Sequence, residues 1–133
     1  MIPFWLLKFT RPLLLTQNGF ARTDAEYDKK IANESDKVWK QIYHCHKEAI
    51  NHQYNGNVNV CLEAQKLIDK NPYVHRQGVP QSGENINIGV LYDDSEKNYI
   101  KAYEYYMKAA KLGNTQAQIN LDILCKKHAW VCK

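Results

Sequence analysis

Apolar residues recur at intervals of three and four positions along most of the chain, and short clusters of turn-forming residues interrupt them. Over residues 33–54 this spacing is typical of one face of an α-helix. The cluster at residues 55–57 breaks the pattern, and Asn57 or Asn59 is placed to cap a second helix that ends before Asn71. Two helices joined by so short a turn predict an antiparallel hairpin.

The second half of the chain shows the same alternation. Residues 71–83 hold two prolines and two glycines without a helical period, which predicts a connecting loop. A helical pattern resumes at residues 80–84 and continues to residue 92. The clearest helix covers residues 98–112 and is placed to end at Gly113, and a last helix begins at residues 114–115. No segment alternates convincingly at period two, so no strand is predicted.

These elements predict an all-α fold, a short right-handed solenoid of about five helices arranged as antiparallel hairpins. The length of 133 residues falls within the usual size of one domain, and 44% hydrophobic and 24% charged residues are typical of a chain that folds. We therefore expect residues 33–133 to form a single helical repeat domain. Residues 1–32 are expected to be a signal-like or flexible N-terminal segment.

The N-terminus resembles an export signal. Residues 2–7 and 13–15 are apolar, Lys8 and Arg11 add positive charge, and small residues follow at 19–21. The same two basic residues interrupt the apolar run of about seven to fifteen residues that a signal needs, so a misplaced start codon and a hydrophobic tail that folds onto the body remain alternatives. A membrane span needs about 20 apolar residues, and no stretch of the sequence supplies them.

The charge argues against a nucleic-acid partner. The sequence has 18 Lys and Arg residues and 14 Asp and Glu residues, which gives a formal net charge of +4. Basic and acidic residues alternate, and the densest basic patch, residues 126–128, is too short for a nucleic-acid surface.

Four cysteines, Cys45, Cys61, Cys125 and Cys132, are compatible with two disulfides and an oxidising compartment, and four reduced thiols in a cytosolic protein are the alternative. Cys45 and Cys61 each lie eight residues from Gln53, near the turn. In an antiparallel hairpin both are about 12 Å along their helices from that point, which predicts that they are bonded to each other.

A bond between Cys125 and Cys132 requires a break in the last helix. Continuous helix would separate the two residues by about 10 Å, beyond the reach of a disulfide. The prediction is therefore that the helix ends near Lys127 and that residues 128–130 turn back. Two disulfides favour a periplasmic or otherwise exported protein, with the cytoplasm as the alternative.

Residues 84–124 resemble the Sel-one-like repeat, a helical hairpin related to the tetratricopeptide repeat. Gly89, Leu91 and Tyr92 stand at that family's LGxLY motif, where Ile88 takes the place of the first Leu. Ala117 begins a further repeat. The matches to the family's second block, KAxxWYxKAAxxG, are Lys101, Ala102, Tyr105, Tyr106, Lys108, Ala109, Ala110 and Gly113.

The sequence departs from that family at three points. Glu84 occupies the place of an opening Ala, the loop between the two helices is short, and Asp122 replaces a Gly. The resemblance implies closely packed helices, with Gly89 and Ala109 where helices touch and Tyr106 filling the space between them.

No catalytic motif is present, so we expect no enzyme activity, no cofactor, no metal and no small-molecule substrate. His44, Glu48 and His52 share one helical face and could bind a divalent metal, but a solvated polar face is the stronger interpretation. His46 falls within the apolar face and is expected to be a hydrogen-bonded core or interface histidine.

Candidate partner-binding residues are Tyr73, His75 and Arg76 in the predicted loop, and Tyr105, the tyrosine expected to be most exposed. Alternatively, the three loop residues are merely exposed to solvent and bind no partner.

The resemblance implies a protein-binding module. Small size and the lack of catalytic groups favour an inhibitor. The resemblance to small, cysteine-rich members of that family implies an immunity protein that neutralises a secreted antibacterial toxin of the type VI kind. The alternatives are an envelope or signalling adaptor and a cysteine-rich secreted enzyme.

Overall fold

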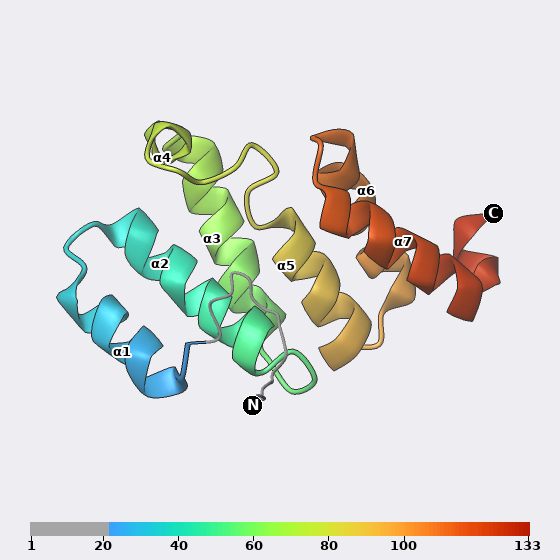
Figure 1. Cartoon of the computed structure of the whole chain (residues 1–133), viewed down its shortest axis with the longest axis horizontal. Coiled ribbons are helices and arrows are strands. Elements are labelled where there is room, and N and C mark those ends of the chain that lie inside the picture. The colour runs from blue at the N-terminus through green and yellow to red at the C-terminus, as the bar shows by residue number, and fades with distance from the viewer. Residues whose placement is uncertain (1–21) are drawn as a thin grey trace, which may run out of the picture.

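The computed structural model describes residues 22–133, and this part of the chain is helical without strands. The predicted N-terminal signal falls mostly on residues 1–21, outside the described residues. Seven α-helices and three π-helical or 3-10 turns follow one another in a row (Figure 1). The elements are α1 (Asp24–Asn33), α2 (Lys37–His46), the π-helical turn η2 (Lys47–Asn51), α3 (Val58–Lys70), α4 (Tyr73–Arg76), α5 (Asn85–Val90), the π-helical turn η3 (Leu91–Ser95), α6 (Tyr99–Lys111), α7 (Thr115–Lys127) and the 3-10 turn η4 (Ala129–Cys132).

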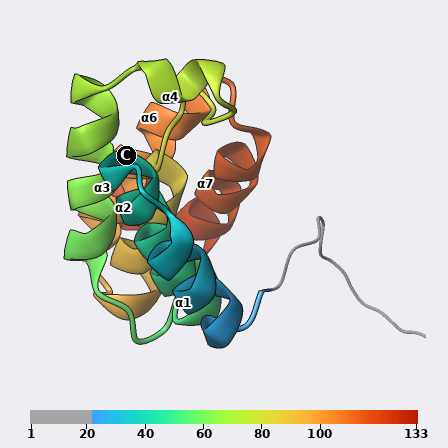
Figure 2. The same cartoon turned by 90° about the vertical axis from the view of Figure 1, so that its left-hand side faces the viewer.

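The predicted all-α fold of antiparallel hairpins is confirmed. Helices α2 and α3 pack as one antiparallel pair, and α5 lies between this pair and the pair formed by α6 and α7 (Figure 1). Figure 2, which faces the α1 end of the row, shows α1 lying against α2. Within residues 22–133 no helix combines the length and the apolar character that crossing a membrane requires.

Asparagine side chains begin three of the helices. The side chain of Asn57 accepts a hydrogen bond from the backbone N–H of Asn59 at the start of α3. Asn98 and Asn114 cap α6 and α7 in the same manner, through bonds to residues three positions further along. Gly113 ends the α6 segment with a φ of 93°, as the sequence predicts, because this conformation is unfavourable for residues with a side chain.

Small residues allow the helices to approach closely, as the resemblance implies. Ala102, Ala109 and Ala117 are fully buried. A Cβ atom added to Gly89 on α5 would lie 2.5 Å from the Cδ1 atom of Tyr106 on α6, closer than any real Cβ contact. The ring of Tyr106 is itself 2% exposed, so it fills the space between the two helices.

Helices α1 and α4 add to the approximately five that the pattern predicts. Only Tyr27 of α1 is buried, and the helix docks by polar contacts: Lys47 Nζ lies 2.8 Å from Asp28 Oδ1 and His52 Nε2 lies 2.7 Å from Asp24 Oδ2. The periodic spacing of apolar residues therefore could not predict α1. Residues 24–32 were expected in the signal-like or flexible segment, yet they are helical.

The other additional helix, α4, interrupts the predicted loop because the buried Val74 packs against α2 and α3.

Both predicted disulfides are present. The Cα atoms of Cys45 and Cys61 lie 4.5 Å apart, and the bond joins α2 to α3. Helix α7 ends at Lys127 and the chain turns back, so that Cys125 bonds to Cys132 in η4.

Candidate functional site

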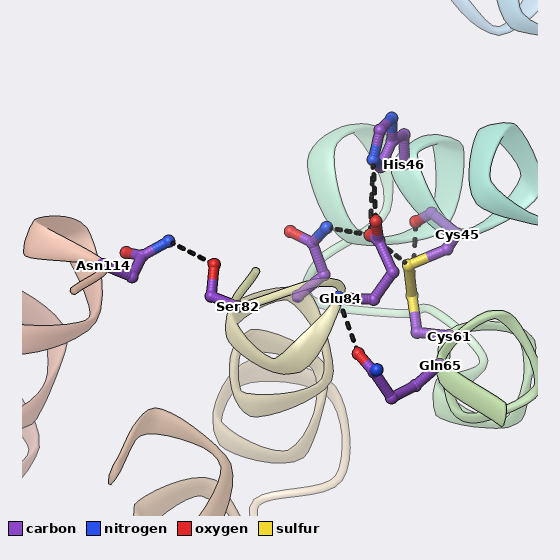
Figure 3. A network of polar contacts seen from close by, with 8 residues as sticks. Cys45, His46, Cys61, Gln65, Ser82, Glu84 and Asn114 are labelled. Carbon is purple, nitrogen blue, oxygen red and sulfur yellow. Dashed lines mark hydrogen bonds and ion pairs between the residues drawn. A yellow bond between two sulfur atoms is a disulfide. The ribbon is translucent and has the colours of Figure 1, made fainter. Parts of the chain in front are cut away.

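A buried polar cluster surrounds Glu84, the residue that precedes α5 (Figure 3). The side chain is 2% exposed. Its carboxylate lies 3.3 Å from His46 Nε2 and accepts a 2.5 Å hydrogen bond from the amide of Asn87. The backbone N–H of Glu84 donates to Gln65 Oε1 over 2.8 Å. Glu84 thereby connects α2, α3 and α5.

The same carboxylate touches the disulfide. Glu84 Oε1 lies 3.2 Å from Cys45 Sγ, which carries no proton in the bonded state (Figure 3). Nearby, Asn114 Nδ2 lies 3.5 Å from the hydroxyl of Ser82, so α7 also reaches the segment that precedes α5. The segment that precedes α5 therefore contacts residues of α2 and α3 and the residue that caps α7.

Two opposing influences act on the pKa of His46. Burial, the larger single influence, lowers it, whereas the negative charge of Glu84 and the hydrogen bond to it raise it. The two contributions of Glu84 prevail, so the pKa of His46 is raised above its ordinary value and its charged form is favoured. The expectation of a hydrogen-bonded histidine at position 46 is confirmed.

This cluster resembles an acid–base pair, but its position argues for a structural role. Glu84 is 2% exposed, and Cys45 and Cys61 are fully buried. A substrate could therefore reach neither the carboxylate nor the disulfide without opening the contact between α2 and α5. What the arrangement can do is hold three helices at a fixed distance.

A groove runs over α5, between η2 on one side and α7 on the other. Ile50 of η2 is 48% exposed and Ile123 of α7 is 47% exposed, and Ile86 and Val90 of α5 lie half-buried between them. We call this hollow the α5 groove. It is lined by Ala49, Ile50, Gln53, Ile86, Asn87, Val90, Asp93, Asp94, Tyr106, Gln116, Asn120, Ile123, Leu124 and Lys127.

Two carboxylates from η3 line the α5 groove. Asp93 Oδ2 accepts a 3.1 Å hydrogen bond from the hydroxyl of Tyr106. Burial, followed by the charge of neighbouring Asp93, raises the pKa of Asp94, and Lys97 and Lys127 only partly oppose this effect. Among residues 22–133, neither the Asp93 nor the Asp94 carboxylate forms an ion pair within 4.0 Å, although Lys97 Nζ donates a 3.0 Å hydrogen bond to the backbone oxygen of Asp94. The groove therefore combines exposed isoleucines with two carboxylates that form no ion pair in this part of the chain.

The predicted binding residues Tyr73, His75 and Arg76 lie together on α4. The Tyr73 hydroxyl donates a 2.6 Å hydrogen bond to Asp36 Oδ2, and His75 Nδ1 lies 3.0 Å from the carbonyl oxygen of Val79. Both side chains thus hold α4 against its surroundings, and Arg76 is the exposed member of the three.

Tyr105, the fourth predicted binding residue, lies on α6 and not on the α4 surface. It is half-buried against Tyr92, with ring centroids 5.7 Å apart, and Lys108 Nζ lies 4.3 Å from its ring centroid. It lines a second hollow with residues of α3 and α5 that include no residue of α4. The structure therefore does not bring the four predicted residues onto one surface.

Of the three side chains considered as metal ligands, His44, Glu48 and His52, two form hydrogen bonds with other residues. Glu48 accepts a 2.7 Å hydrogen bond from the backbone of Asn57, and His52 contacts Asp24. The α-helix passes into a π-helical turn at Lys47, which changes the spacing between these positions. In the part of the chain that the structure describes, no group of three or more His, Cys, Asp or Glu residues could hold a metal ion.

Sequence reasoning missed the α5 groove. A signal was present, because Ile123 lies outside the buried stripe of α7, which consists of Ala117, Leu121 and Leu124. Single apolar residues outside the buried stripe of a helix are common, so Ile123 alone does not indicate a binding surface. Only the fold shows that Ile50, far away in the sequence, lies on the facing wall.

Comparisons with protein-family models, with curated proteins and with solved structures found no match to this chain. The findings establish an all-helical domain with two disulfides, and the likeness of residues 84–124 to Sel-one-like repeats stays a resemblance.

Proposed function

We propose that this chain is a protein-binding helical module that inhibits its partner, specifically an immunity protein of Sel-one-like type that neutralises a secreted antibacterial toxin. The observation that carries the proposal is the α5 groove, where Ile50 and Ile123 remain about half exposed on a disulfide-bonded framework. Exposed aliphatic side chains that face each other across a hollow are typical of a surface that another protein covers.

The packing supports the repeat-type assignment. Gly89 against Tyr106, and the buried Ala102 and Ala109, lie where the resemblance to Sel-one-like repeats requires small residues. Stacked helical pairs of this kind present side chains from several helices on one surface, which suits the binding of a protein more than that of a small molecule.

The disulfides support an exported protein. Cys45–Cys61 and Cys125–Cys132 account for all four cysteines, and stable disulfides form in oxidising compartments such as the periplasm. A toxin delivered between competing bacteria would meet its inhibitor there.

The test is to export the product of the adjacent gene to the envelope of a sensitive cell, with and without this protein. We expect killing by that product alone and survival when the protein is present. Ile123→Glu should lose protection, whereas the matched change Ile100→Glu should keep it, because Ile100 is 57% exposed but lies outside the α5 groove. A harmless product, or equal killing in both strains, would favour an adaptor with endogenous partners.

A further inference from the structure

We propose that the α5 groove binds a partner segment in which a Lys or Arg side chain stands beside aliphatic side chains. The proposal rests on the proposed protein-binding function and adds the surface and the chemistry of the partner. It follows from two properties of the groove, its apolar walls and its acidic pair.

The apolar part of the site is formed by residues of three elements. Ile50 of η2 and Ile123 of α7 face the groove from opposite walls, and Val90 of α5 lies between them. The disulfide between α2 and α3, together with the Glu84 cluster, fixes η2 relative to α5. The η2 wall is therefore held in place relative to α5 before a partner arrives, which lowers the entropic cost of binding there.

The charged part of the site is the Asp93 and Asp94 pair. Among the residues that line the groove, these two carboxylates face the single ammonium of Lys127, and the ammonium of Lys97, outside the lining, is bound to the backbone oxygen of Asp94. Lys127 is exposed and makes no ion pair with either carboxylate. A guanidinium or ammonium from a partner could form the ion pair that neither carboxylate makes within the described residues, whereas a carboxylate would be repelled.

Amide side chains that also line the groove can form hydrogen bonds with the backbone of an incoming segment. Gln53, Gln116 and Asn120 line the groove, and each offers both a donor and an acceptor. Gln116 and Asn120 already bond to each other over 3.0 Å, which orients their remaining groups. Helical partners bind in such grooves through apolar residues spaced three and four apart.

The experiment titrates the full chain with a synthetic peptide of about 14 residues that has Leu at helical spacing and Lys between. The control peptide replaces every Lys by Glu. Methyl NMR spectra should show shifts at Ile50, Val90 and Ile123 with the Lys peptide, and none at Ile100, an exposed isoleucine outside the groove. The double variant Asp93→Asn/Asp94→Asn should weaken binding by about tenfold, and added salt should weaken wild-type binding.

The matched charge control is Asp122→Asn, because Asp122 is exposed on α7 and does not line the groove. This variant should bind the Lys peptide as the wild type does. Equal binding of both peptides, equal weakening by Asp122→Asn, or shifts centred on Ile100 would overturn the proposal. So would a dimer in light scattering with Ile50 and Ile123 at its interface, because a second copy would then occupy the groove.

The outcome is separable from that of the proposed function. Protection against the toxin without groove binding of the Lys peptide would overturn this inference and leave the inhibitor proposal standing. Binding of the Lys peptide in the groove without protection against the toxin would overturn the inhibitor proposal and leave this inference standing.

Discussion

The Nε2 atom of His46 lies 3.3 Å from the Glu84 carboxylate, and this contact joins the end of α2 to the beginning of α5. Glu84 is 2% exposed, so a buried acid stands at this junction. The pair therefore couples the stability of the fold to the protonation of one histidine.

The first prediction concerns that coupling. Because the pKa of His46 is raised in the fold above its ordinary value of 6.5, the pair stabilises fully below that value and loses its effect as pH rises through the folded pKa. His46→Gln should cost roughly 1 to 3 kcal/mol at acidic pH and less in the alkaline range. Urea unfolding of both proteins across pH measures the difference. A cost that stays constant or grows with pH would contradict the assignment.

The second prediction concerns the close contact of α5 with α6. Gly89→Ala should destabilise by about 1 to 3 kcal/mol, because the added methyl group would meet the Tyr106 ring. Thermal unfolding measures the loss. In a Tyr106→Leu background the same change should cost much less, and an equal cost in both backgrounds would place the strain elsewhere.

The third prediction concerns the end of α6. Gly113 has a φ of 93°, and a Cβ atom added there would have no atom within 4 Å, so a substitution is penalised by the backbone conformation and not by a clash. Gly113→Val should lower stability by about 1 to 2 kcal/mol. Gly113→Asn should cost less, because Asn tolerates the left-handed region better. Equal melting temperatures for the two variants would argue against this explanation.

The fourth prediction concerns the order in which the disulfides are reduced. Cys45 and Cys61 are fully buried, whereas Cys125 and Cys132 are half-buried at the end of the chain. Mild reductant should therefore open Cys125–Cys132 first, as timed alkylation and peptide mass spectrometry would show. Replacing Cys45 and Cys61 by Ser should cost about 2 to 4 kcal/mol. Reduction of both bonds at the same rate would indicate that global unfolding precedes either step.

Local chemistry explains which elements could be predicted. Asn57 and Gly113 act on the backbone within a few residues, so their effect is readable from the sequence. Cys45 and Cys61 follow from the same logic, because the turn between them sets the register. Helix α1 escaped prediction because polar contacts hold it.

The α5 groove and the Glu84 cluster depend on contacts between distant residues. His46 and Glu84 are 38 positions apart, and no periodic pattern relates them. Ile50 and Ile123 are ordinary exposed residues until the fold places them on facing walls. The partner-binding candidates were chosen by residue type. Residue type alone does not show that the Tyr73 hydroxyl is hydrogen-bonded to Asp36.

The two disulfides also bear on how the chain matures. Each joins cysteines close in sequence, with separations of 16 and 7 residues, and the first pair precedes the second entirely. A chain that is oxidised as it emerges from its N-terminus therefore offers Cys45 its native partner, Cys61, before Cys125 arrives. The bonds can form in the order of synthesis, without passing through mispaired species that an isomerase must correct.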